Sequence, residues 1–419
     1  MGRISFILRC LAACAGLLLG SRLCQAEVQT PEARFIVRSD VTGIIHTKPE
    51  TILELLPRPV PDHFNDQEVK EFERRVRNLA IFDAVQVSVV DQVLVVVVRE
   101  KFTLAPIVNF STGKTNQDID VTAGAGEYNI GGEATKLAAI FRYNQRRPNF
   151  ELAMAQHSFH PTRWAKEANL FLASSAFRFQ DSSAGWHRDR LGGELEWKSP
   201  YRYGSPLRYE IVLRAYREFI ADASIQAPPS GYFIGIAPEL IWDRYHWHDL
   251  VPSGYRLTLE LRPGYFLGPN QNRHEGRLRY LQGVPLGQQT VLMLNGVAEA
   301  VNAGNVNHSV LIGSQAGVRG LADNLYRNRA QSYLNTELRH AVSIGPRWAV
   351  QGVVFSDLAL FQGMGQDGST RGWTGAANVG GGVRIIPTWL TSTLLRVDVA
   401  RLLAPTDAWL VQTAIAQYF

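Results

Sequence analysis

The sequence predicts a mainly β protein, in which one small α/β domain precedes a transmembrane antiparallel β-barrel of about 16 strands. The chain ends in an alternating strand, Trp409–Phe419, whose last residue is a phenylalanine. Residues 102–419 contain many strand-like runs separated by Gly, Pro, Asn and Asp. In a membrane barrel, one face of each strand meets lipid and the other meets the lumen, which produces this alternation.

The composition is compatible with a barrel and excludes a helical membrane protein. Hydrophobic residues make up 46% of the chain, and no segment after residue 26 is an unbroken apolar run of about 18 residues. The formal net charge is +5, and the arginines are scattered through strand-like segments. This pattern does not indicate a nucleic-acid surface.

Residues 1–26 have the features of a secretory signal peptide. Two arginines flank the start of an apolar run, Cys10–Gly20, that is too short to span a bilayer. Ala26 suits the position before the cleavage site. Leu11–Cys14 resembles a lipoprotein box, but cleavage there would divide the apolar run.

All of the cysteines, Cys10, Cys14 and Cys24, lie in this signal. The mature chain is therefore expected to have no disulfide, no thiolate metal site and no cysteine nucleophile.

Residues 27–101 are expected to form the small α/β domain. The predicted order is strand, helix, helix, strand, strand, because apolar spacing changes from alternation to helical periods and back. Asp66 is the expected N-cap of the second helix. The elements are a strand within 34–45, helices over 48–56 and 67–80, and strands over 84–90 and 93–98, the last two joined by a tight turn at Asp91-Gln92.

This order resembles a POTRA domain, the polypeptide-transport-associated module of the periplasm. The stretch Leu79–Val87 looks like the helix-to-strand junction of that family. The alternative is a generic α+β domain without that role.

The region after residue 101 has the spacing of membrane strands. Leu207–Tyr216 and Tyr255–Arg262 alternate between apolar and polar residues. At about 20 residues for each strand and its connection, about 16 strands fit. Eight aromatic residues are candidates for interfacial girdles, with ordinary core or loop positions as the alternative: Trp164, Trp186, Trp197, Tyr201, Tyr203, Trp242, Tyr245 and Trp247.

The sharpest internal motif is Gly317-Val318-Arg319-Gly320, which stands between a predicted strand and a long loop. Later strands carry Glu337-Leu-Arg339 and Phe355-Ser-Asp357. This arrangement resembles the BamA/TamA superfamily of outer-membrane assembly and translocation proteins. In that family, a loop carrying a similar motif folds back into the barrel lumen.

An arginine held inside a barrel needs a carboxylate partner, because an unpaired desolvated charge is costly. We expect Arg319 to pair with Asp357, with Glu337 as a second candidate. A bidentate pair would hold the loop on the wall. The expected lumenal loop latch is therefore Val318, Arg319, Gly320, Glu337 and Asp357.

Two further pieces resemble the family: Gly126–Gly132, as a turn early in the barrel, and Gly380–Arg384 with Leu395–Asp398, as its last strands. The sequence also departs from the family. Leu321 stands where an aromatic residue is usual, Gln417 stands where barrel-ending strands prefer an aromatic residue, and only one POTRA-like module is evident.

The resemblance implies a bacterial outer-membrane protein with its POTRA domain in the periplasm. It would assist insertion of proteins into this membrane, or their translocation across it, after client capture by the POTRA domain. Implied partners are unfolded outer-membrane or secreted proteins, outer-membrane lipid, and periplasmic chaperones or accessory subunits. A weak seam is expected between Phe102–Phe110 and the last strand, whose signal and seam residues are Val411, Ile415, Tyr418 and Phe419.

The alternatives are a dedicated conduit for one secreted protein or lipid, and a passive channel. No enzyme activity, cofactor or metal is expected. His246 and His248 share one face of a strand if that segment is extended, but a loop is the preferred interpretation.

Overall fold

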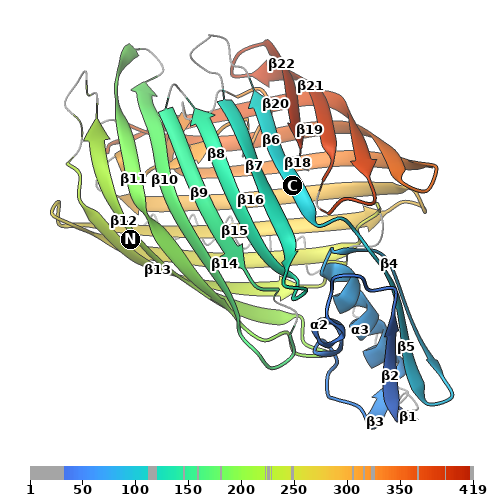
Figure 1. Ribbon diagram of the computed structural model, residues 1–419. Coiled ribbons are helices and arrows are strands. Elements are labelled where there is room, and N and C mark those ends of the chain that lie inside the picture. Colours follow the sequence, from blue (N-terminus) through green and yellow to red (C-terminus); the bar gives the residue numbers. More distant parts are fainter. Residues whose placement is uncertain are drawn as a thin grey trace, which may run out of the picture.

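The structure is a computed structural model of the chain (Figure 1). It describes residues 33–111, 120–144, 147–157, 160–179, 182–221, 223, 227, 229–246, 250–303, 306–314, 317–321, 326–365, 368–391 and 393–415. The predicted signal peptide, Trp247, His248, Gln417, Tyr418 and Phe419 lie outside the described residues.

Sixteen long antiparallel strands form a barrel, and the first and last of them, β6 and β22, meet (Figure 1). This confirms the predicted fold class. The strands are β6 (Leu104–Ser111), β7 (Asp120–Ile130), β8 (Thr135–Asn144), β9 (Arg147–Ala155), β10 (Ala165–Phe179), β11 (Ser182–Lys198), β12 (Leu207–Ala221), β13 (Tyr232–Asp243), β14 (Gly254–Leu267), β15 (Gln271–Pro285), β16 (Thr290–Ala303), β18 (Tyr326–Ile344), β19 (Trp348–Met364), β20 (Thr370–Pro387), β21 (Leu395–Ala404) and β22 (Ala408–Ile415).

The barrel is apolar outside and charged inside. In β21, Leu395, Val397 and Val399 are exposed, whereas Arg396 and Asp398 are buried. Because successive strand residues point to opposite faces, the apolar set covers the outer wall and the charged set lines the lumen. This is the reverse of a water-soluble protein, and it suits an outer wall in contact with lipid.

The aromatic residues only partly follow the girdle prediction. Trp164 and Trp242 are exposed, as girdle residues must be. Trp186 is 2% exposed and Tyr201 is 3% exposed, so the girdle interpretation is wrong for these two. Tyr203 also has another role, because it packs against the small domain. Alternation alone could not separate these environments.

The small domain contains a three-stranded sheet, in which β5 lies between β2 and β4. Strand β2 is parallel to β5, and β4 is antiparallel to it. No helix among the described residues is both long enough and apolar enough to cross a membrane. The elements are β1 (Ala33–Ile36), β2 (Arg38–Thr42), α2 (Pro49–Leu53), β3 (Asp62–Asn65), α3 (Asp66–Asn78), β4 (Phe82–Val90) and β5 (Val93–Glu100).

Three details of this domain differ from the predictions. The first predicted strand is divided at Val37 into β1 and β2, and β1 pairs with β3, which was not predicted. Phe64 is the only large apolar residue of β3, so its sequence carries no alternation signal. The N-cap of α3 is Asn65 rather than Asp66, because Asn65 forms a capping box with Glu68.

The hairpin between β4 and β5 has the predicted turn. Asp91 and Gln92 both have positive φ, 49° and 64°. Two consecutive residues of positive φ are typical of the turn whose twist matches a two-residue hairpin.

The small domain lies against one end of the barrel (Figure 1). The backbone N–H of Lys48 donates to the carbonyl of Gly132, in the turn between β7 and β8. The hydroxyl of Tyr203, in the β11–β12 connection, donates to the carbonyl of Leu55 at 2.7 Å. This end of the barrel is therefore the one that faces the small domain.

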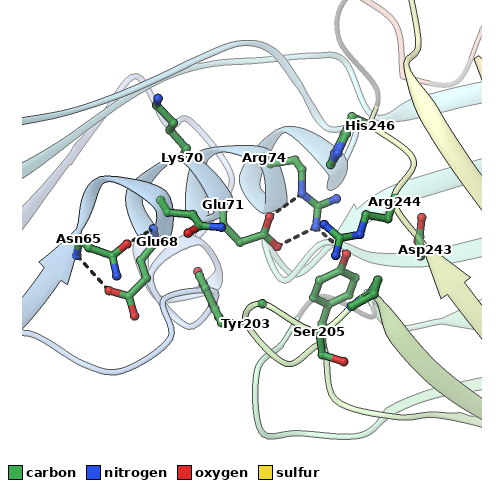
Figure 2. Close-up of a pocket in the computed structure, with 14 residues that line it drawn as sticks. Asn65, Glu68, Lys70, Glu71, Arg74, Tyr203, Ser205, Asp243, Arg244 and His246 are labelled. Carbon is green, nitrogen blue, oxygen red and sulfur yellow. Dashed lines mark hydrogen bonds and ion pairs between the residues drawn. The ribbon is translucent and has the colours of Figure 1, made fainter. Parts of the chain in front are cut away.

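The guanidinium of Arg75, on α3, is the centre of this contact. Its side chain is fully buried, and its Cζ atom lies 3.5 Å from the ring centroid of Tyr203. The neighbouring Arg74 donates to Glu71 and to the Tyr201 hydroxyl. Figure 2 shows Arg74, Glu71 and Tyr203 beside a cavity of about 550 Å³ at this junction.

Candidate functional site

The connection between β16 and β18 enters the barrel. A short helical turn, η1 (Val306–His308), is followed by β17 (Val310–Ile312), which pairs with the start of β18. The side-chain oxygen of Asn307 accepts from the indole N–H of Trp186 on β11, at 2.9 Å. His308 stacks on Phe266 of β14, with ring centroids 3.8 Å apart. The connection thus contacts walls on both sides of the lumen.

The predicted motif lies at the inner end of this connection. Gly317 has φ of 134°, and a Cβ atom there would lie 2.5 Å from Ile312, so glycine is required. Val318 and Leu321 are buried with Ile312 and Tyr333 in one apolar cluster. Leu321 therefore fills the apolar place against the wall without an aromatic ring.

Arg319 makes a bidentate pair with Asp357 of β19. Its Nε atom donates to Oδ2 at 2.9 Å, and Nη2 donates to Oδ1 at 2.7 Å. The backbone N–H of Arg319 donates to the same carboxylate at 3.0 Å. Nη1 donates to Oε1 of Glu337, on β18, at 2.7 Å. All three side chains are fully buried.

Phe355 of β19 supplies the aromatic surface that the loop motif lacks. The Cζ atom of Arg319 lies 3.4 Å from the centroid of this ring. Gly380 lies opposite Phe355 in the β19–β20 pair. A Cβ atom on Gly380 would lie 2.3 Å from the ring. The glycine therefore provides the space in which the ring supports the guanidinium.

Two asparagines complete the hydrogen bonding of the Asp357 carboxylate. The Asn335 amide donates to Oδ1 at 2.8 Å and also to the carbonyl of Gly317. The Asn378 amide donates to Oδ2 at 2.6 Å and to the carbonyl of Arg319. Each asparagine thus joins a barrel strand to the backbone of the loop as well as to the carboxylate.

Glu337 joins the latch to a wider network of charges. It accepts from Arg339 of its own strand at 2.6 Å and from Arg384 of β20 at 3.1 Å. The carboxylate of Asp398, on β21, lies 3.6 Å from Arg319. These alternating charges compensate one another, which a buried ionic cluster needs in order to be stable.

This arrangement can hold the loop in place on the barrel wall. Among the described residues, no group of three or more His, Cys, Asp or Glu side chains could hold a metal ion.

The structure brings together all five residues of the expected latch, from the loop and from β18 and β19. Sequence reasoning missed Phe355, Asn335, Asn378, Arg384 and Asp398 as members of the site. For Arg384 and Asp398 a signal existed, because both stand in motifs that resembled the last barrel strands. For the asparagines none existed, since polar residues facing a lumen are common.

Strand β22 meets β6, the first strand of the barrel. Among the described residues, these strands pair at Thr413–Phe110 and Ala414–Asn109. On its other side, every residue of β6 pairs with β7. Val411 is exposed and Ile415 ends β22, while Tyr418 and Phe419 lie outside the described residues.

No protein-family model and no curated protein matches the chain. Solved structures do. CdiB from Acinetobacter baumannii has 12% sequence identity and a TM-score of 0.61, with 91% of this chain and 74% of that chain covered. CdiB from Escherichia coli has 12% identity and a TM-score of 0.54, with 95% and 93% covered.

A third similar structure is BamA from Haemophilus ducreyi, solved without its POTRA domains 1–3. It has 13% identity and a TM-score of 0.54, with 91% of this chain and 84% of that chain covered. At such low identity the likeness concerns the fold. This chain therefore has the fold of the BamA and CdiB barrels.

Proposed function

We propose that this protein is a bacterial outer-membrane barrel that assists the insertion of proteins into the membrane or their translocation across it. The observation that carries the proposal is the buried bidentate pair between Arg319 and Asp357. It fastens a loop inside the lumen, as the resemblance to the BamA/TamA superfamily implies. A simple pore does not require hydrogen bonds that attach a lumenal loop to the barrel wall.

The small domain is proposed to be a periplasmic POTRA domain that captures clients. Within the described residues, β2 and β4 are the outer strands of its main sheet. An extended client segment could add to such an edge through backbone hydrogen bonds, which tolerate many sequences. A photo-cross-linker at Asp40 of β2 or at Ser88 of β4 would identify the edge that clients contact.

The meeting of the first and last barrel strands, β6 and β22, is where we propose that insertion takes place. A strand edge that is easily freed can pair with an incoming strand, while an open edge within lipid is costly if left unpaired. The free energy of client folding would drive the step, so no nucleotide is required.

The test is depletion of the protein followed by quantitative proteomics of the outer membrane and culture fluid. Loss of many unrelated barrels would support general insertion. No change in either fraction would contradict the proposal.

A second candidate is a dedicated conduit for one secreted protein. The described residues before β6 form one α/β module, which offers few docking surfaces for accessory subunits. Loss of a single secreted or surface protein in the same experiment would favour this candidate.

A further inference from the structure

The lumen contains two adjoining cavities away from the loop latch. One, of about 260 Å³, lies on the inner wall of β11, β14 and β15, next to η1. The other, of about 450 Å³, lies closer to the end that faces the small domain. They share Arg262 and Arg277, so they form one continuous polar space.

Positively charged side chains outnumber negatively charged ones in the lining of both cavities. The smaller cavity is lined by five arginines and two glutamates. The larger is lined by six lysine or arginine side chains and three glutamates. In the latch, by contrast, a carboxylate faces each guanidinium, so the excess is a property of this part of the lumen.

The carboxylates of the smaller cavity already have partners. Glu275 pairs with Arg262 and Arg273. Glu299 accepts from Gln331 at 2.9 Å and lies 3.7 Å from Arg262. Glu260 and Glu299 lie opposite Arg277 on the neighbouring strands, but neither forms an ion pair with it among the described residues.

Three arginines in this space form no ion pair with a carboxylate of the described residues: Arg190, Arg277 and Arg279. Arg190 packs over the ring of Tyr216 at 5.3 Å, and its Nε atom has no hydrogen-bond partner there. The Nε atom of Arg277 also has none. Arg279 donates to the neutral amide of Asn295. Because Arg277 and Arg279 are two residues apart on β15, they face the same side of the strand.

We propose that this space is an anion-binding site that takes a phosphate group. Guanidinium forks match the oxygens of phosphate and bind them in pairs, and Arg190 and Arg277 line one cavity from strands β11 and β15. A multivalent anion would balance the excess charge, whose desolvation is otherwise costly. The combined space admits a phosphate with an attached organic group, whether the source is a free phosphate or a lipid headgroup.

The test is isothermal titration calorimetry of the full-length protein in a zwitterionic detergent and a phosphate-free, low-salt buffer. The probes are inorganic phosphate and glycerol 3-phosphate. Equal affinities would identify a site for the phosphate group alone. An affinity about tenfold higher for glycerol 3-phosphate would identify a headgroup site. Failure of both probes to bind would overturn the proposal.

Variants make the test specific. In Arg277→Gln/Arg279→Gln, the affinity should fall about tenfold or more, because charge-assisted hydrogen bonds are lost. Arg190→Gln, which changes the arginine on β11, should also weaken binding of the anion. This variant serves as the test if the double variant does not fold. Folding is checked by heat-modifiable electrophoretic migration.

The matched control is Arg142→Gln. Arg142 lies 3.7 Å from Glu151 and lines neither cavity. Its variant should bind as the wild type does. Unchanged binding in the arginine variants of the site, or equal loss in the control, would refute the assignment.

Discussion

At the scale of single residues, the bidentate pair between Arg319 and Asp357 links the loop to the wall. Both side chains are fully buried, and the carboxylate accepts from the side chain and the backbone of Arg319. Removing one partner from such a pair costs about 3–5 kcal/mol, because the other charge remains buried.

Arg319→Ala should therefore leave the barrel folded but impair function, since the loop loses its attachment. Arg319→Lys should restore little, because an ammonium cannot make the bidentate contact. Growth or client assembly in a complementation assay measures the effect. The control is Arg401→Ala, whose pair with Asp407 is exposed. Full activity of Arg319→Ala would refute the latch.

Gly380 is a second position at which a substitution would disturb the site, because even one added side-chain carbon does not fit. Its Cβ would collide with the Phe355 ring and with the carbonyl of Val399. Gly380→Ala should displace the ring from beneath Arg319 and lower the thermal stability of the barrel by about 1–3 kcal/mol. Gly352→Ala is the matched control, because nothing lies within 4 Å of a Cβ there. Equal melting temperatures for the two variants would contradict this role.

At the scale of elements, the contact between α3 and the β11–β12 connection holds the small domain on the barrel. Arg75→Ala should weaken this contact by about 1–3 kcal/mol, because cation–π and packing interactions with Tyr203 are lost. Spin labels at Ser88 and Gly287 would then show a broader distance distribution. Arg38→Ala, at an exposed position of the same domain, should leave the distribution unchanged.

We predict that a second docking contact, between Glu54 after α2 and the β9–β10 connection, depends on pH. Burial raises the pKa of Glu54, but a hydrogen bond with His157 and the charge of Arg163 outweigh it, so the pKa lies below its ordinary value of 4.5. Burial lowers the pKa of His160 below its ordinary value of 6.5.

Both pKa shifts make docking of the small domain less favourable as the pH falls. His160 is favoured in its neutral form, so its contribution is present above pH 6.5 and is lost as the pH falls below that value. The contribution of Glu54 is lost only below pH 4.5. Between about pH 7.5 and 5, the distance distribution should therefore broaden, and His160→Asn should reduce this change. A distribution that does not vary with pH would be inconsistent with this assignment.

At the scale of the whole molecule, the barrel closes where β22 meets β6. A disulfide in Phe110→Cys/Thr413→Cys joins two directly opposed residues. If function requires the seam to open, the oxidised variant should be folded but inactive, and reduction should restore activity. The control is Val108→Cys/Ala123→Cys between the fully paired β6 and β7. Activity of the oxidised seam variant would exclude lateral opening.

The sequence by itself predicted the barrel, the two helices and the final hairpin of the α/β domain, and the five residues of the expected latch. These follow from local patterns: alternation assigns each side chain to one face of its strand, and a buried arginine calls for a carboxylate. The error at Val37 arose because β1 and β2 are too short for a pattern to repeat, and the error at Asn65 arose because Asn65 and Asp66 are both suitable N-cap residues.

The tertiary structure alone decided which faces meet. Alternation places Phe355 and Gly380 inside the lumen but does not say that they are opposed, since register depends on pairing along the whole strand. Docking of Arg75 on Tyr203 joins residues more than a hundred positions apart. The convergence of Arg190 and Arg277 from β11 and β15 likewise exists only because the sheet closes on itself, which brings distant strands around one lumen.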